Sequence, residues 1–80
     1  MPKAVVRDNE FINVFGERVK ALREERAWSI YYLSKITGIP RNQLHLIEKG
    51  SINTNISVIP FLCEAFEIEI VELMTLNYSI

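Results

Sequence analysis

The N-terminal part of the chain carries apolar residues at the three- and four-residue spacing of an amphipathic helix. Charged residues fill most of the positions between them, so that one side of such a helix would be apolar and the other polar. Asp8 or Asn9 suits the N-cap, while Arg23 and Arg26 suit the negative end of the helix dipole. This pattern predicts a helix over residues 9–26. Its expected apolar face is formed by Phe11, Val14, Phe15, Val19 and Leu22.

Two short helices joined by a tight turn are predicted next. Ser29 is a good N-cap for a helix over residues 30–36, with Leu33 and Ile36 as its apolar anchors. Gly38 ends this helix, because glycine tolerates the left-handed backbone that is common just after a helix.

A third helix is predicted over residues 40–48, since proline is favoured in the first turn, where its missing N–H costs nothing. Leu44 and Ile47 face inward, and Gly50 ends the helix. Two short helices separated by a few residues that include a glycine form a helix-turn-helix, which we place at about residues 29–48.

Two further helices complete an all-α fold of five helices. The fourth begins at Asn55 or Ser57 and ends near Phe66, and the fifth covers about residues 69–76. A chain of 80 residues is expected to form one domain, residues 1–80. The apolar stripe of the fourth helix is Ile56, Ile59, Leu62, Cys63 and Phe66.

The composition raises the question of what stabilises so small a fold. Hydrophobic residues make up 49% of the chain, yet a domain of this size buries only roughly 60% of the surface that its unfolded form exposes. Cys63 is the one cysteine and is expected to be a small buried residue, and no Cys/His group has metal-ligand spacing. We therefore expect no metal, no cofactor, and self-association as the added source of stability.

Targeting signals are not apparent in the sequence. The longest apolar run, Val58 to Cys63, is far shorter than the roughly twenty residues that span a membrane. Residues 1–6 lack the apolar stretch of a signal peptide. We expect a cytoplasmic protein without a membrane partner.

Charge is distributed unevenly along the chain. All nine Lys and Arg residues lie within the first fifty positions, together with six acidic residues, whereas residues 51–80 carry four Glu and no base. The halves therefore differ, at +3 and −4, although the net charge is −1. Such a division favours one face that attracts a polyanion and another that stays in solvent.

The order and spacing of particular residues resemble the Cro/CI-type helix-turn-helix family of phage repressors and bacterial regulators. Within that family the chain is most similar to compact dimeric regulators such as the controller proteins of restriction–modification operons. The resemblance implies a five-helix fold whose third helix enters the major groove of DNA, where all four base pairs are distinguishable. The matching residues are Phe15-Gly16-Glu17-Arg18-Val19-Lys20-Ala21-Leu22-Arg23, Ser29, Leu33, Gly38-Ile39, Leu44, Ile47-Glu48-x-Gly50 and Asn53.

The resemblance also implies roles for individual residues. The base-reading positions fall on Arg41, Asn42 and Leu46, with His45 beside them; Arg suits guanine, Asn suits adenine, and Leu46 either meets a thymine methyl or marks reduced base reading. Arg23 and Glu48 occupy positions that form an ion pair in the family. The implied phosphate contacts are Ser29, Ile30, Tyr32, Lys49, Ser51 and Asn53, with Arg18, Lys20 and Lys35 as outer charges.

Two departures from the family pattern affect these roles. Ile30 stands where Gln is common, and an isoleucine side chain cannot donate to a phosphate. Tyr31 and Tyr32 stand where charged residues are usual, although a tyrosine hydroxyl can supply such a contact.

The surplus of apolar residues in the C-terminal part suggests a two-fold interface, unless it packs under the terminal segments instead. Apolar surface left in water is costly, at about 25 cal/mol per Å². A dimer would set two recognition helices about 34 Å apart, as a pseudo-palindromic operator requires. The predicted interface residues are Val58, Phe61, Ala65, Ile70, Val71 and Met74.

The leading hypothesis is a homodimeric, sequence-specific DNA-binding regulator whose partners are double-stranded DNA and a second copy of itself. The alternative is a protein-interaction module, a partner of another regulator or of a toxin, that uses the same scaffold and binds DNA weakly or not at all. An enzyme is not expected, because the lone His45 has no nucleophile or acid at catalytic spacing.

Overall fold

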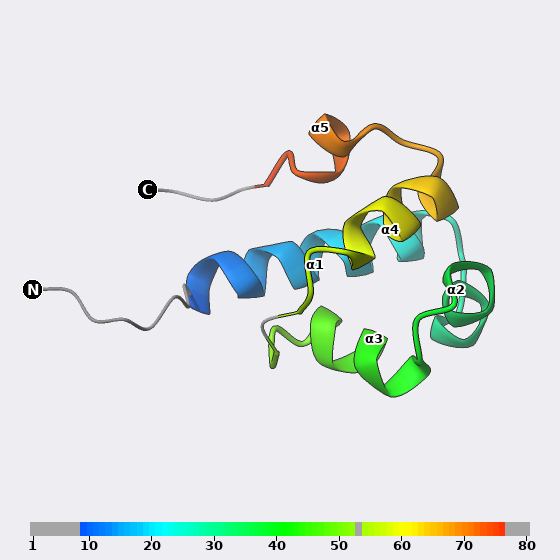
Figure 1. Ribbon diagram of the computed structural model, residues 1–80, viewed down its shortest axis with the longest axis horizontal. Helices are drawn as coiled ribbons and strands as arrows, with labels where there is room; N and C mark the ends of the chain where they lie inside the picture. Colours follow the sequence, from blue (N-terminus) through cyan, green and yellow to red (C-terminus); the bar gives the residue numbers. More distant parts are fainter. Residues whose placement is uncertain (1–8, 53, 77–80) are drawn as a thin grey trace, which may run out of the picture.

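Five helices follow one another in the computed structural model, which describes residues 9–52 and 54–76 (Figure 1). The described residues contain no strand, so the predicted all-α architecture is confirmed. The first three helices begin and end within one residue of their predicted bounds. The helices are α1 (Asn9–Glu25), α2 (Ile30–Thr37), α3 (Arg41–Glu48), α4 (Val58–Phe66) and α5 (Ile70–Leu73).

The long helix α1 runs through the middle of the molecule, and the shorter helices are arranged around it. Figure 1 shows α3 and α5 on opposite sides, with α2 at the end away from the N-terminus. Each helix contributes to one shared hydrophobic core, and α5 contributes through Leu73, which is fully buried. The buried core residues are Phe15, Val19, Leu22, Leu33, Ile39, Leu44, Ile47, Val58, Leu62, Phe66 and Leu73.

A glycine allows α1 and α3 to pack closely together. A Cβ added at Gly16 would lie 2.1 Å from the carbonyl oxygen of Ile47 and 3.0 Å from that of Glu48, both on α3. Because backbone atoms cannot move aside as a side chain can, this crossing requires glycine. The close contact fixes the C-terminal end of α3 against the core.

Two arginines, one on α1 and one directly after it, hold the C-terminal ends of α4 and α5. Arg26 donates to the carbonyl oxygen of Phe66 at 2.9 Å, and its guanidinium lies 5.0 Å from the centre of the Phe66 ring. Arg18 donates from Nη2 to the carbonyl oxygen of Glu72 at 2.7 Å and from Nε to that of Leu73 at 3.4 Å. Cations complement the last carbonyl groups of a helix, so both arginines act as remote caps.

Several positions differ from the sequence-based expectation. Val58, predicted at a dimer interface, belongs to the core, because α4 begins at Val58 and turns Val58, Leu62 and Phe66 inward at four-residue steps. Ile36 is 41% exposed rather than an anchor, since Leu33 and Thr37 form the inward side of α2. Ile56 lies before α4 begins and is exposed.

The fifth helix is also shorter than expected. It ends at Leu73 instead of near residue 76, and Met74 is its C-cap. The Thr75 hydroxyl donates to the carbonyl oxygen of Val71 at 2.8 Å, an arrangement by which threonine competes with continued helix.

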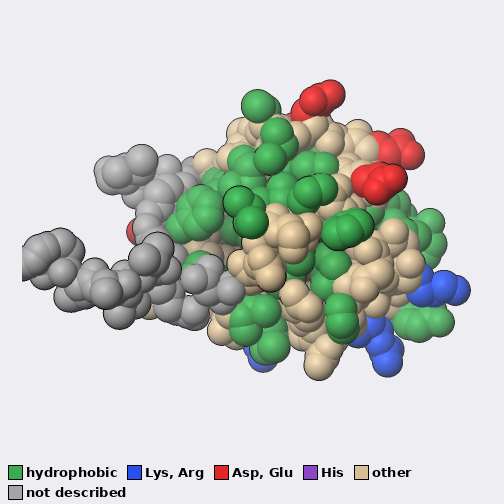
Figure 2. Space-filling view, in the orientation of Figure 1, with side chains coloured by type: hydrophobic (Ala, Val, Ile, Leu, Met, Phe, Trp, Pro, Cys, Tyr) green, Lys and Arg blue, Asp and Glu red, His purple; other side chains and the backbone are tan. Residues whose placement is uncertain are grey.

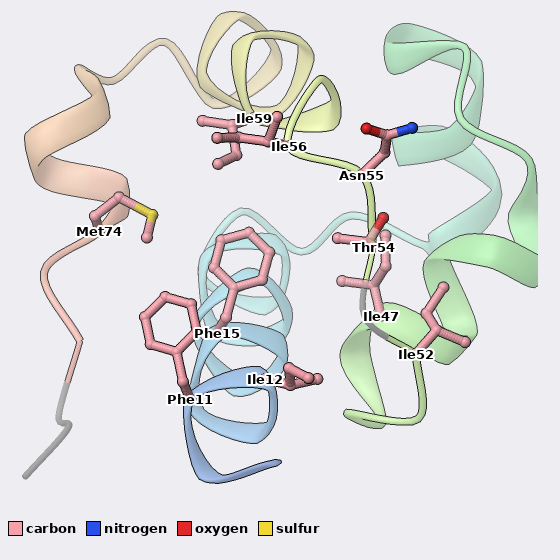
Figure 3. A pocket seen from close by; sticks show the side chains of 10 residues that line it. All are labelled: Phe11, Ile12, Phe15, Ile47, Ile52, Thr54, Asn55, Ile56, Ile59 and Met74. Atoms are coloured by element: carbon pink, nitrogen blue, oxygen red, sulfur yellow. The ribbon is translucent and has the colours of Figure 1, made fainter. Parts of the chain in front are cut away.

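An apolar pocket of about 270 Å³ lies between the N-terminal half of α1, the segment that precedes α4, and α5 (Figure 3). Phe11 and Phe15 form one wall, and Met74, the residue directly after α5, points toward it. Met74, another predicted interface residue, is therefore half-buried and turned toward the body of its own chain. No helix among the described residues is long and apolar enough to cross a membrane.

Candidate nucleic-acid interface

The turn between α2 and α3 is held by side chains as well as by its backbone. The Thr37 hydroxyl donates to the carbonyl oxygen of Leu33 at 2.7 Å and accepts from the Ile39 N–H at 3.1 Å, while the Ser34 hydroxyl donates to the carbonyl oxygen of Ile39 at 2.6 Å. Gly38 adopts a φ of 81°, in the left-handed region. The angle between the two helices is thus fixed by local bonds, and α3 is presented on a rigid support.

Three of the six phosphate contacts that the resemblance implies lie at the beginning of α2. The Ser29 Oγ accepts from the Tyr32 N–H at 3.0 Å, so the serine hydroxyl oxygen caps the helix. Ile30 packs against the core, which leaves only its backbone for a phosphate. Tyr32 is exposed and its ring centre lies 5.1 Å from that of Trp28. The N-terminal turn of α2, which is the positive end of the helix dipole, faces solvent.

The outer edge of α3 carries all four predicted base-reading residues. Its inward side is formed by Leu44 and Ile47. The opposite edge is exposed and is not covered by any other described part of the chain, as insertion into a groove requires. The Asn42 Oδ1 accepts from the Gln43 N–H at 2.9 Å, which leaves the Asn42 side-chain amide N–H groups to solvent. The exposed residues of this edge are Arg41, Asn42, His45, Leu46 and Lys49.

The C-terminal end of α3 places two further predicted phosphate contacts in solvent. Lys49 is the C-cap residue, and Gly50 follows with a φ of 70°. The Ser51 N–H donates to the carbonyl oxygen of Leu46 at 2.9 Å, closing the helix end in the manner of a Schellman motif. Lys49 and Ser51 are both exposed. Asn53, the last predicted phosphate contact, lies outside the described residues.

Arg23 and Glu48 form a two-bonded ion pair between α1 and α3. Nε of Arg23 lies 2.8 Å from Oε2 of Glu48, and Nη2 lies 3.0 Å from Oε1. Arg23 also donates from Nη1 to the carbonyl oxygen of Trp28 at 2.8 Å, so one guanidinium joins α1, the α1–α2 turn and α3. The hydrogen bond to Glu48 raises the pKa of Arg23 above its ordinary value. The pair positions α3 and leaves the outer edge free.

The structure assigns Arg18 a different role from the one that the resemblance implied. Arg18 caps α5 and is thereby directed away from the helix-turn-helix, whereas it was expected as an outer phosphate charge. The bonds of Ser34, Thr37 and Arg26 were not anticipated from the sequence. The Thr37-Gly38 pair indicates the end of a helix, but the sequence does not show which backbone groups form hydrogen bonds with the Thr37 hydroxyl.

Basic and acidic side chains lie on different sides of the molecule. In Figure 2 the Lys and Arg side chains visible on this face lie along its lower side, near α2 and α3, while acidic side chains stand out at the upper right, near α4 and α5. The uneven charge of the sequence therefore becomes a difference between two sides of the molecule. Among the described residues, no group of His, Cys, Asp or Glu is arranged to hold a metal ion.

Comparison with known proteins agrees with this geometry. The sequence profile of the family described as "Helix-turn-helix domain" matches residues 16–79. A protein of Pyrococcus horikoshii described as an HTH-type transcriptional regulatory protein is 39% identical over 57 residues, which are 71% of this chain. The chain spans only 18% of the length of that relative.

Solved structures share the fold. The restriction–modification controller protein C.AhdI from Aeromonas hydrophila superposes with a TM-score of 0.74 and 29% identity, over 82% of this chain and 98% of that one. A hypothetical transcription factor from Neisseria gives a TM-score of 0.77 at 19% identity, over 96% of this chain and 90% of that one. An HTH_3 family transcriptional regulator from Vibrio cholerae gives 0.77 at 22% identity, over 84% and 38%. With a family match over most of its length and a fold shared with these proteins, the chain belongs to the helix-turn-helix domain family.

Proposed function

We propose that this protein binds double-stranded DNA sequence-specifically as a homodimer on a pseudo-palindromic operator, in the cytoplasm, and so controls transcription nearby. Residues 1–80 act as a single DNA-binding domain. Proteins of this class are not enzymes, and binding alone carries the function. The observation that supports the proposal best is the exposed edge of α3, held from behind by the Gly16 crossing and the Arg23–Glu48 pair.

Base reading is assigned to the outer edge of α3. Arg41 would donate to guanine O6 and N7, and Asn42 would use its side-chain amide toward adenine. His45 flanks them, and Leu46 would meet a thymine methyl. Phosphates would be held by the α2 N-terminus at Ser29, Ile30 and Tyr32 and by Lys49 and Ser51 at the other end of α3.

A dimer interface is proposed on α4 and α5. Phe61 is 52% exposed, and Ile70 and Val71 are more exposed still. Figure 2 shows hydrophobic side chains gathered on the side of the molecule that carries these helices. Phe61 also lines a hollow with Gly38 and Pro40 of the α2–α3 turn, so a partner that covers it would lie beside the recognition helix. Ala65, which is half-buried, would border the contact.

The test of DNA binding is selection from a random duplex library, followed by anisotropy titrations of the selected site against a scrambled duplex. We expect a site with two-fold symmetry and an affinity that falls steeply with salt. Arg41→Ala should relax the preference at one base pair per half-site, at a cost of about 1–3 kcal/mol, whereas Lys49→Ala should weaken all sequences alike. Equal behaviour of the two variants would contradict the assignment of roles.

The test of the dimer is light scattering at micromolar concentration. Phe61→Glu should reduce the mass from two chains to one, because the charge cannot be buried against a second copy. Ile36→Glu is the matched control, since Ile36 is also an exposed apolar residue but lies on α2, and it should leave the mass unchanged. A monomeric unmodified protein would rule out the two-fold interface.

The second candidate, a protein-interaction module with weak or no DNA binding, is favoured by one observation on α3. Leu46 is apolar and 38% exposed in the middle of the proposed reading edge. In that case no sequence would be enriched from the library, and the affinity for duplex would depend little on salt.

A further inference from the structure

Tyr31 is a large aromatic residue on the outer side of α2 that the core does not use. Its side chain is 56% exposed. The centre of its ring lies 5.5 Å from Cζ of Arg41 and 5.6 Å from Nζ of Lys35. Lys35 is one turn further along α2, but Arg41 is the first residue of α3. The ring therefore joins the two helices of the helix-turn-helix at the surface where DNA would lie.

The contact between Arg41 and Tyr31 leaves the arginine able to read a base. A guanidinium that rests on an aromatic ring uses its flat face, and the N–H groups at its edge stay free. Guanine O6 and N7 accept from that edge. Within the described residues Arg41 forms no ion pair with a carboxylate that would compete for the same N–H groups.

Restricting the Arg41 side chain in the free protein also reduces the conformational entropy that is lost when DNA binds. Arginine is rich in rotamers, and a side chain that is ordered only on binding lowers the affinity by the entropy that it loses. An aromatic ring that restricts Arg41 beforehand removes part of this loss. The gain applies only where Arg41 meets its base, so it increases discrimination as well as affinity.

We propose that Tyr31 is a positioning residue for base recognition, which holds the Arg41 guanidinium on its ring at the start of α3; this rests on the DNA binding proposed above. Arg41 contacts the base, and Tyr31 acts through Arg41. Base preference at the pair that Arg41 reads therefore depends on the aromatic ring of residue 31 and not on its hydroxyl.

The experiment measures base preference separately from affinity. Arg41→Ala first identifies the base pair at which preference is lost, and the ratio of dissociation constants for the preferred and substituted pair is then measured in each variant. Tyr31→Leu should lower this ratio about two- to fivefold, the size expected for one exposed cation–π contact. Tyr31→Phe, which keeps the ring, should retain the ratio of the unmodified protein.

Two controls separate this role from a general one. Tyr32→Leu removes a neighbouring tyrosine whose ring contacts Trp28, and it should leave the ratio unchanged even if all sequences bind less tightly. In the Arg41→Ala background, Tyr31→Leu should have no further effect on the ratio. In the free protein, the ring-current shift of the Arg41 side-chain protons should disappear in Tyr31→Leu and persist in Tyr31→Phe.

The outcomes are distinguishable. If the unmodified protein selects no sequence, the proposed function fails and this inference fails with it. If it selects a site and Arg41→Ala abolishes one preference while Tyr31→Leu keeps it, the DNA-binding proposal stands and the role of Tyr31 is wrong. An equal loss of preference in Tyr31→Phe and Tyr31→Leu would likewise overturn it, because the hydroxyl would then be responsible.

Discussion

At the scale of single residues, Gly16 has the sharpest requirement in the fold. Alanine is the better helix former by about 1 kcal/mol, so a solvent-facing Gly→Ala change in α1 would stabilise the protein. At position 16 the new Cβ would lie 2.1 Å from a backbone oxygen of α3. We expect Gly16→Ala to lower the free energy of unfolding by about 1–3 kcal/mol through overpacking, measured by urea titration.

The control for Gly16 is Glu17→Ala, a change on the exposed side of the same helix. It should alter stability much less, because the alanine side chain adds no atom toward α3. Stabilisation of the protein by Gly16→Ala would show that α1 and α3 are not in the close contact described here.

Cys63 gives a second prediction at this scale. Burial, and then the negative charge of Glu69, raise the pKa of its thiol. Since the folded state holds the proton more tightly, the thiol contributes to stability below its ordinary pKa, and this contribution is lost as the pH rises through the raised value. Alkylation by iodoacetamide at pH 8 should be slower in the folded protein than in urea. Equal rates would mean that the thiol is neither buried nor perturbed.

Residue-level contacts were predictable from the sequence where they are local or where the family resemblance implied them, as for Arg23 and Glu48. Ser29 was expected to cap α2, and its Oγ does so three residues away. The Arg18 bond to Glu72, by contrast, joins positions 54 residues apart. The residues around an arginine in the sequence of α1 do not show whether its side chain reaches the end of another helix. Tertiary packing decides this. Arg18 was therefore expected at DNA and was found at α5.

At the scale of elements, α5 is the helix that depends most on others. It has four residues, far fewer than an isolated helix needs, so its order comes from tertiary contacts. Leu73 provides a buried anchor, and Arg18 provides the cap. The spacing of the apolar residues predicted a longer helix. That spacing does not show how few tertiary contacts the segment makes, and those contacts decide where α5 ends.

Removing the cap should loosen α5 selectively. Arg18→Met keeps the apolar stem and loses the guanidinium, at a cost of about 1 kcal/mol for a partly exposed charged hydrogen bond. Amide exchange at Leu73 and Met74, whose N–H groups bond within α5, should become about fivefold faster. The Leu44 amide of α3 should keep its rate, and Lys20→Met, on the exposed side of α1, should change neither. Equal acceleration in α3 and α5 would show that Arg18 supports the whole fold and not one helix.

At the scale of the whole molecule, six of the seven described Lys and Arg residues fall into two groups, and the seventh, Lys20, is exposed on α1. Arg18, Arg23 and Arg26 are bound to carbonyl or carboxylate oxygens of their own chain. Lys35, Arg41 and Lys49 lie on the exposed surface of the helix-turn-helix. Counting Lys and Arg in the sequence therefore overstates what is available to DNA, while the net charge of −1 understates it, because the acidic residues of the C-terminal part gather on the α4–α5 side.

This division predicts how binding should depend on salt. Because Arg41 is assigned to a base, Lys35 and Lys49 are the cations of the helix-turn-helix that can neutralise phosphates. Two per chain, or four in a dimer, correspond to a slope of about −4 in a plot of log K against log salt. Lys49→Gln should reduce the magnitude of the slope by about 2 in the dimer, since each copy then neutralises one phosphate fewer. Glu64→Gln on α4 changes the net charge by the same amount in the opposite direction and should leave the slope unchanged. If both variants shifted the slope equally and oppositely, the field of the whole protein rather than contacts at α3 would govern binding, and the division of charge between the two sides would carry no functional meaning.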